Sequence, residues 1–131
     1  MKKNGILNSE ISKVLSDMGH TDYICIGDCG LPVPEGVKKI DLALKIGTPS
    51  FIEVLEEIKK DMVIEKIILA DEIKEKNKTM LTNISLILPT QETDFMSHED
   101  FKKMLKNAKA VIRTGEATPY SNIILISGVS F

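Results

Sequence analysis

Tryptophan is absent from this sequence, and aromatic residues make up only 5% of its 131 positions. Aliphatic side chains supply the apolar material instead, because hydrophobic residues still reach 43% of the chain. That fraction is typical of a folded domain with its own core and argues against intrinsic disorder. The length fits one domain, so we expect residues 1–131 to form a single unit.

The sequence also lacks a surplus of basic charge, since 17 Lys and Arg residues face 19 Asp and Glu residues. A nucleic-acid partner is therefore not expected, because phosphate binding draws on clustered basic residues. No apolar run approaches the roughly 20 residues of a membrane-spanning helix. The charged residues at 2–3 are not followed by the apolar stretch of a signal peptide. We expect a cytoplasmic protein with no membrane partner.

Cysteine is scarce, with Cys25 and Cys29 as the only two. In a reducing compartment we expect no structural disulfide between them. With His20 nearby the pair could suggest zinc, but its spacing differs from that of usual ligand pairs and no second cluster exists. We interpret Cys25, which lies in an apolar run, as a core residue. Glycine-rich nucleotide motifs are missing too, so the sequence predicts neither a metal nor another cofactor.

Four helices are predicted, three from apolar residues at helical spacing and one, over 72–83, as an exposed helix with the charged residues Glu75, Lys76 and Lys78. They cover residues 7–18, 48–60, 72–83 and the segment that starts at Ser97. For the first helix, Asn8 or Ser9 can cap the start and Gly19 suits the end. For the second, we expect Thr48 to be the N-cap and Pro49 the first helical residue. Ser97 and Asp100 have the spacing of a capping box.

Short apolar runs rich in β-branched residues predict strands between these helices. They cover residues 23–27, 63–70, 84–88, 110–112 and 123–126, with a short strand or transition segment inside 37–44; residues 90–96 are expected to be loop. Alternating strands and helices predict helices on a largely parallel sheet. The last two strands are joined by too few residues for a parallel crossover, so the final strand should be antiparallel to its predecessor if the two are neighbours. The predicted fold is a three-layer α/β/α domain with a mixed, mostly parallel sheet.

Two titratable residues flank the strand predicted at 23–27: His20 precedes it and Asp28 follows it. In α/β proteins ligands gather where strands end, so Asp28 with its neighbouring glycines is a candidate polar site. The alternative is that Asp28 and the glycines only form a turn. Histidine titrates near neutral pH and suits proton transfer, whereas the alternative role for His20 is to cap free carbonyls at a helix end.

Further candidates lie in the second half of the chain. His98 falls in the first turn of the helix that Ser97 starts, and the alternative is a surface histidine without a function. Asp71 and Glu72 follow a predicted strand directly. They can sit in the first turn of the next helix, where its dipole favours acidic residues, or they can face a ligand cleft.

Several motifs, in the same order along the chain, resemble the D-ribose pyranase family. They are the opening Met1–Ser12, the Met18-Gly19-His20-Thr21-Asp22 unit, Asp28-x-Gly30-Leu31-Pro32, Gly47-x-Pro49-Ser50-Phe51, and the long stretch Val111–Leu125 with its Tyr120-Ser121-Asn122 loop. The resemblance spans the whole chain. It is strongest over residues 4–55 and 110–131 and weakest over 73–95.

The resemblance implies an isomerase that interconverts the pyranose and furanose forms of D-ribose, and its anomers as well, without a cofactor. It assigns the catalytic role to His20. Sugar-binding roles fall to Asp28, His98, Tyr120, Ser121 and Asn122. It also implies a homo-oligomeric ring, a decamer of stacked pentamers, with the site near a subunit boundary. The residues suit the chemistry, because ring opening needs one proton removed and one delivered, which an imidazole near neutral pH can supply or relay.

Three alternatives remain at this stage. One is a mutarotase of another sugar, such as fucose, which a panel of sugars would distinguish. Another is a non-catalytic sugar-binding accessory of transport, which would bind ribose without accelerating its exchange. The third is a structural ring-forming subunit, which would bind no sugar.

Overall fold

Six strands form one mixed sheet in the computed structural model, which describes residues 1–131. In sheet order they are β2 (Lys39–Asp41), β5 (Val111–Arg113), β1 (Tyr23–Gly27), β6 (Ile123–Ser127), β3 (Ile64–Ala70) and β4 (Glu92–Met96). Strand β6 is antiparallel to both of its neighbours, β1 and β3, and every other pair is parallel. The mixed, mostly parallel sheet is therefore confirmed.

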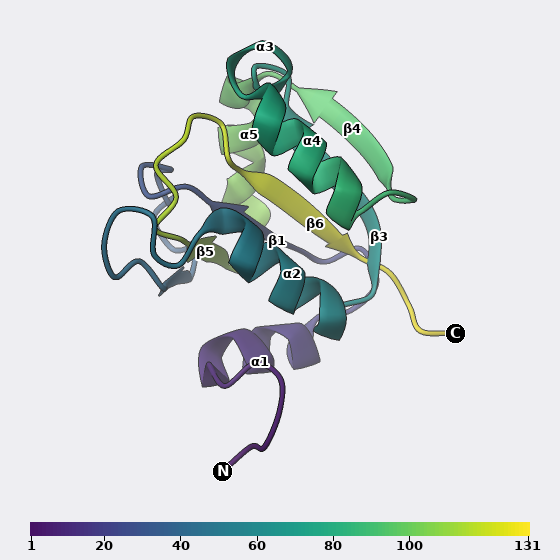
Figure 1. Ribbon diagram of the computed structural model, residues 1–131. Helices are drawn as coiled ribbons and strands as arrows, with labels where there is room; N and C mark the ends of the chain where they lie inside the picture. Colours follow the sequence, from purple (N-terminus) through teal and green to yellow (C-terminus); the bar gives the residue numbers. More distant parts are fainter.

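Helices cover both faces of this sheet (Figure 1). They are α1 (Ser9–Asp17), α2 (Phe51–Asp61), α3 (Ile73–Lys76), α4 (Lys78–Ile87) and α5 (His98–Met104), which a 3₁₀ turn over Leu105–Asn107 extends. On one face, Ile11, Phe51 and Ile84 of α1, α2 and α4 belong to the larger core cluster. On the other face, Phe101 of α5 packs in a second cluster with Cys25. The structure thus has the three expected layers, and none of its helices has the length and apolar character to cross a bilayer.

Local sequence chemistry determines several element starts as predicted. The strand at 23–27 is confirmed. The side chain of Asn8 accepts a hydrogen bond from the amide of Ile11 at 2.9 Å, and Ser97 accepts one from Asp100 at 3.1 Å. Each cap satisfies an amide that the first helical turn leaves without a partner. Helix α1 ends slightly earlier than expected, with Met18 in extended conformation at its C-cap.

The predicted start of the second helix is wrong by two residues. Ser50 is the N-cap of α2, and it forms a capping box in which its side chain accepts from the amide of Glu53 at 3.2 Å. Thr48 instead closes a turn, because its amide donates to the carbonyl of Lys45 at 3.0 Å, and the bond to Pro49 is cis. Since Thr48 is engaged in that turn, the first residue free to cap the helix is Ser50.

We expect Ser50→Ala to lower the free energy of unfolding by about 1 kcal/mol, because the capping hydrogen bond is lost. Urea unfolding followed by circular dichroism measures the change. Ser85→Ala is the matched control, since Ser85 lies within α4, exposed, and only bonds back to the carbonyl of Leu81. Equal stability of the two variants would contradict the capping role.

The region 72–96 differs most from the sequence prediction. Residues 84–88 are not a strand: Ile84 and Leu88 point to the core from the end of α4, four residues apart. A short apolar run fits a buried helical turn as well as a strand, so periodicity cannot separate the two. Residues 92–96, expected to be loop, form β4 by backbone pairing with β3. Their polarity reflects an edge strand, where Lys66 bridges to Glu92 and Asp94.

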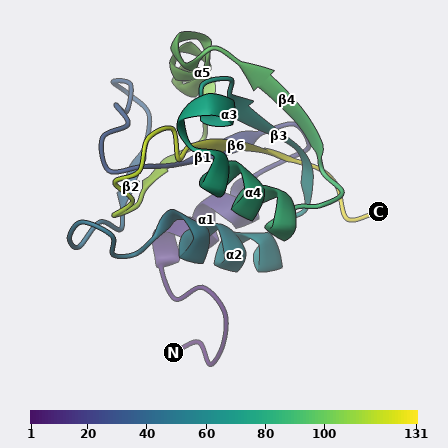
Figure 2. The same cartoon turned by 45° about the horizontal axis from the view of Figure 1, so that its top comes forward.

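Strands β5 and β6 are not neighbours, because β1 lies between them. The last strand was predicted to be antiparallel to the strand before it only if the two were neighbours, so that prediction does not apply. Strand β6 is instead antiparallel to β1 and β3. The connection 114–122 must pass the end of β1 to reach β6. It forms the yellow-green loop on the left of Figure 1, and Figure 2 shows the same loop beside β2. This crossing brings the Tyr120–Asn122 segment to the residues that follow β1.

Candidate functional site

Five of the six predicted site residues gather where β1 and β4 end and β6 begins. Asp28 follows β1, His98 begins α5, and Tyr120, Ser121 and Asn122 precede β6. The amide of Asp28 donates to Oδ1 of Asn122 at 2.9 Å. The ring of Tyr120 meets the His98 ring edge-on, with 5.2 Å between their centroids. The fold therefore joins segments that lie about a hundred residues apart in sequence, between Asp28 and Asn122.

Hydrogen bonds from the end of β5 tie the turn after β1 to the loop before β6. The hydroxyl of Thr114 donates to the carbonyl of Gly27 at 2.8 Å. The amide of Cys29 donates to the carbonyl of Glu116 at 2.8 Å, and Nε of Arg113 donates to the carbonyl of Cys29 at 3.0 Å. Asp28 is thus held between two anchored neighbours, which gives its carboxylate a defined place.

Two residues outside the six predicted site residues support the site: Asn77, which the sequence did not single out, and Glu72, which it offered either for a helix start or for a ligand cleft. Nδ2 of Asn77 lies within hydrogen-bonding distance of the Pro119 carbonyl at 2.8 Å and of the Ser121 hydroxyl at 3.2 Å. Asn77 breaks the helix expected over 72–83, because it ends α3 and caps α4. The carboxylate of Glu72 accepts from the amide of His98, with its nearer oxygen at 2.8 Å. An asparagine within a helical pattern can be recognised in the sequence as a break in the helix. Its contact with a loop 42 residues away cannot be predicted from the sequence.

Two buried nitrogens at this end of the sheet lack a partner. They are Nδ1 of His98 and Nδ2 of Asn122, and Asn122 is only 1% exposed. Buried polar atoms are almost always hydrogen-bonded in native proteins. Since the chain itself offers these two atoms no partner, a bound ligand can supply it. Ser121 is fully buried and bonded to Thr118 and Asn77, so it shapes the loop. The half-buried Asp28 and Tyr120 add an acceptor and a hydroxyl, a set that suits a polyhydroxylated ligand.

Cys25 lies next to this end of β1, and it is fully buried in the second core cluster. Burial raises the pKa of its thiol, and the nearby Asp28 carboxylate raises it further. The thiol therefore stays neutral, which confirms its interpretation as a core residue. Neither cysteine forms a disulfide, and no group of three or more His, Cys, Asp or Glu residues is arranged to hold a metal ion.

His20 lies at the opposite end of the sheet, before β1. Its Nε2 is 2.6 Å from Oε2 of Glu65, near the start of β3. The next residue, Thr21, donates its amide to the carbonyl of Ser127, where β6 ends. Strand β1 separates His20 from Asp28, and its five residues span roughly 17 Å at about 3.3 Å per residue. Within one chain, the structure does not bring His20 to the other predicted site residues.

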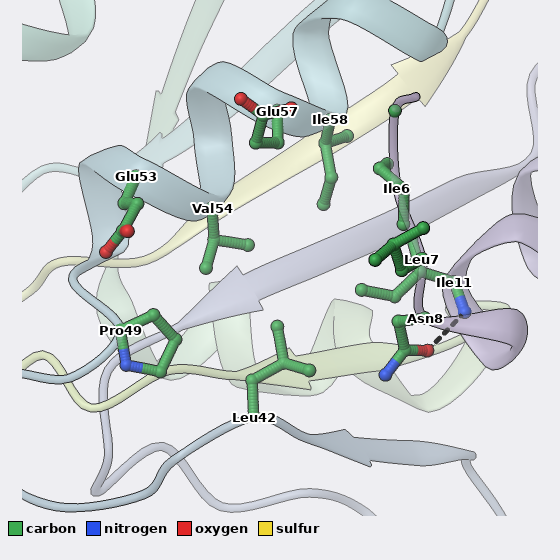
Figure 3. A pocket seen from close by; sticks show the side chains of 11 residues that line it. Ile6, Leu7, Asn8, Ile11, Leu42, Pro49, Glu53, Val54, Glu57 and Ile58 are labelled. Carbon is green, nitrogen blue, oxygen red and sulfur yellow. Dashed lines mark hydrogen bonds between the residues drawn. The ribbon is translucent and has the colours of Figure 1, made fainter. Parts of the chain in front are cut away.

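The larger hollows of the surface do not coincide with the polar cluster. The groove in Figure 3 has a volume of about 310 Å³ and lies between the N-terminal segment, α2 and Leu42. None of the six predicted site residues lines it. His20 lines a separate hollow of about 290 Å³ with the C-terminal residues 127–131. The unpartnered polar atoms, and not the size of a cavity, therefore identify the candidate site.

The comparisons with known proteins agree with the fold and with the resemblance seen in the sequence. Residues 1–130 match the RbsD / FucU transport protein family. The chain is 55% identical to a "D-ribose pyranase" of Bacillus cereus and 57% identical to one of Lactobacillus acidophilus, each over 131 residues and 100% of both chains.

Solved structures give the same result. The structure of Bacillus subtilis RbsD complexed with D-ribose has a TM-score of 0.97 and 53% identity, covering 100% of both chains. A fucose mutarotase of Streptococcus pneumoniae, in complex with L-fucose, has a TM-score of 0.81 and 23% identity over 95% of each chain, a likeness of fold alone. The match of the family model over residues 1–130, together with the fold, establishes that this chain belongs to the RbsD / FucU transport protein family.

Proposed function

We propose that this chain is an isomerase that interconverts the pyranose and furanose forms of D-ribose, and its anomers, without a cofactor. The observation that carries the proposal is the pair of unpartnered buried nitrogens, on His98 and Asn122, beside Asp28 and Tyr120. Proteins named D-ribose pyranase that share 55–57% of its residues over the full length support it, as does the ribose complex of a relative with 53% identity.

The polar cluster binds the sugar in this proposal. Asp28 accepts hydrogen bonds from sugar hydroxyls, and the amide nitrogen of Asn122 donates one. His98 offers Nδ1, and Tyr120 offers a hydroxyl that can donate or accept. Ser121 holds the loop in the conformation that presents its two neighbours, through its bonds to Asn77 and Thr118.

His20 supplies the acid–base group, and it comes from a second copy of the chain. A sugar held beside Asp28 is roughly one strand length, about 17 Å, from the imidazole of the same chain. The side chain of His20 is 52% exposed, so it is accessible to a neighbouring molecule. A contact between the His20 end of one copy and the Asp28 end of the next uses two different surfaces. Such head-to-tail interfaces generate rings when the rotation closes.

The ring geometry agrees with the decamer of stacked pentamers that the family resemblance implies. Each chain acts as one domain in this assembly and contributes half of two different sites. We place the protein in the cytoplasm, because its substrate in this proposal is a free metabolic sugar.

The reaction is a reversible ring opening. The imidazole of His20 takes the proton of the anomeric hydroxyl, the bond between C1 and the ring oxygen breaks, and that oxygen receives a proton. The open-chain aldehyde then recloses when the hydroxyl at C4 attacks C1 and loses its proton, while the carbonyl oxygen gains one. Each direction moves one proton off and one proton on, so a single imidazole that can accept and donate a proton can serve both.

A second candidate is a non-catalytic sugar-binding accessory of transport, which the description of the family as transport proteins favours. It would use the same polar cluster without His20. Saturation-transfer NMR between the pyranose and furanose signals of D-ribose separates the two, with L-fucose as the parallel substrate. We expect faster exchange of ribose than of fucose; binding without faster exchange would support the accessory, and faster exchange of fucose would support a fucose mutarotase.

We expect Tyr120→Phe to weaken ribose binding by about 2- to 10-fold, the effect of one neutral hydrogen bond. Titration calorimetry measures the affinity. Tyr23→Phe removes the other tyrosine hydroxyl, which bonds to the carbonyl of Met104 away from the polar cluster, and serves as the matched control. Undiminished affinity of the Tyr120 variant would remove this residue from the sugar site.

A further inference from the structure

Glu65 contacts the imidazole to which the proposed function assigns proton transfer. We propose that Glu65 is a positioning residue: it accepts the hydrogen of Nε2 of His20 and leaves Nδ1 as the nitrogen that exchanges protons with the sugar. This inference rests on the proposed role of His20. It adds a residue and a nitrogen assignment that the sugar-binding cluster does not contain.

The contact itself has a clear chemical consequence. Oε2 of Glu65 lies 2.6 Å from Nε2 of His20. A carboxylate can only accept a hydrogen bond, so Nε2 must carry the hydrogen. A neutral imidazole has one N–H and one lone pair, which places the lone pair on Nδ1. The carboxylate therefore selects the tautomer and restrains the rotation of the ring.

A break in the strand pairing brings Glu65 to this position. Ile64 of β3 pairs with Ser127 of β6, but the next pair joins Lys66 to Ile126. Two steps along β3 thus match one step along β6, so Glu65 is the extra residue of a β-bulge. Bulges bend the strand and redirect a side chain, and they are frequent next to active sites.

Gly128, the residue after β6, lies close to one side of Glu65. A methyl group at Gly128 would lie 3.2 Å from Cβ of Glu65 and 3.5 Å from its Oε2. The amide of Gly128 is fixed by its bond to the carbonyl of Val63 at 3.0 Å. Asp61, which lines the hollow beside His20, makes no hydrogen bond or ion pair with His20. Glu65 is therefore the group placed to orient the imidazole.

Both side chains remain open on their outer side. His20 is 52% exposed and Glu65 is 50% exposed. They lie at the end of the sheet that faces a second copy in the proposed head-to-tail contact. Since Glu65 holds Nε2, the sugar of that copy meets the remaining nitrogen. Glu65 itself does not bind the sugar, so its loss should change the rate and not the affinity.

The test combines the tautomer with the kinetics. In protein labelled with ¹⁵N-histidine, and with His98→Gln used to assign the two histidines, we expect Nδ1 of His20 to show the shift of a lone-pair nitrogen in the neutral state. Glu65→Ala should give a mixture of tautomers. It should slow ribose exchange by about 10- to 100-fold, a part of the roughly 10²–10⁴ that an acid–base group supplies. The ribose dissociation constant should stay within about twofold.

Three further variants make the test specific. Glu65→Gln keeps an acceptor for Nε2–H, so it should recover part of the lost rate and also guards against misfolding of the alanine variant. Gly128→Ala, which crowds Glu65 from the residue after β6, should also slow exchange. Glu57→Ala removes an exposed carboxylate of α2, which pairs with Lys60 and not with His20, and should leave the rate unchanged.

The outcomes separate this inference from the proposed function. If the wild-type protein accelerates exchange and Glu65→Ala does so equally well, Glu65 is not a positioning residue, while the isomerase function stands. A hydrogen on Nδ1 of His20 in the wild-type protein would also overturn the inference. If the wild-type protein does not accelerate exchange, the proposed function fails, and the tautomer measurement still decides the role of Glu65.

Discussion

Replacing His20 with alanine should slow ribose exchange by about 10²- to 10⁴-fold, the usual contribution of an acid–base group. The fold should survive, because the side chain is half exposed and makes one hydrogen bond, to Glu65. Saturation-transfer NMR measures the exchange rate, and circular dichroism checks the fold. His98→Gln is the informative comparison, since it should weaken ribose binding. An unchanged exchange rate in His20→Ala would refute the acid–base role.

The same variant tests whether the site forms between copies of the chain. Mixing His20→Ala with the double variant Asp28→Ala/Tyr120→Ala, after dissociation and reassembly, should restore activity that neither has alone. In a head-to-tail ring, a working site forms where the intact polar cluster of a His20→Ala copy meets the intact His20 of an Asp28→Ala/Tyr120→Ala copy. Random assembly gives that combination at about one quarter of the interfaces.

The contrary result of the mixing experiment is equally clear. If the mixed oligomers form and their exchange rate stays at the level of the separate variants, the two halves do not meet across an interface. Wild-type protein taken through the same dissociation and reassembly is the control for recovery. Sedimentation of the mixture verifies that mixed rings are present.

Replacing Gly115 with alanine should destabilise the protein and disturb the sugar site together. A methyl group at this position would lie 2.5 Å from the carbonyl of Lys45 and equally close to the amide and carbonyl of Thr48. These are backbone atoms, and two hydrogen bonds hold their segment to Gly115. The amide of Gly47 donates to the carbonyl of Gly115, and the amide of Gly115 donates to the carbonyl of Pro49. Overpacking of this kind costs about 1–3 kcal/mol of unfolding free energy.

The loop that carries Tyr120 and Asn122 continues from Gly115, so its displacement should also weaken ribose binding. Urea unfolding and titration calorimetry measure the two effects. Gly30→Ala is the matched control for stability, because its methyl group would meet only Oδ1 of Asp28, at 3.5 Å. Equal stability of the two alanine variants would show that the 42–49 segment can move away at little cost.

Much of the architecture follows from local sequence patterns. The apolar run at 23–27 forms a buried strand, and the caps at Asn8 and Ser97 start their helices. The order of the motifs indicates the family, which the match over residues 1–130 confirms. These features depend on side-chain periodicity and on hydrogen bonds over three or four residues, which are readable from neighbouring positions alone.

Two departures from the predicted elements needed distant partners. Residues 84–87 complete α4 and Leu88 is its C-cap, an arrangement that points Ile84 and Leu88 into the core. Residues 92–96 become a strand because β3 offers a free edge for backbone hydrogen bonds. Neither choice is encoded in local propensity, since the first run is apolar in either state and the second is polar throughout most of its length.

The sequence by itself determined the kinds of residues at the site and the family to which the chain belongs. Only the tertiary structure decided their arrangement: Asp28, His98 and the Tyr120–Asn122 loop meet at one end of the sheet, and His20 lies with Glu65 at the other. The physical reason is that the residues before and after a strand lie at opposite ends of the sheet. Strand order and a one-residue bulge then determine which distant side chains those residues meet.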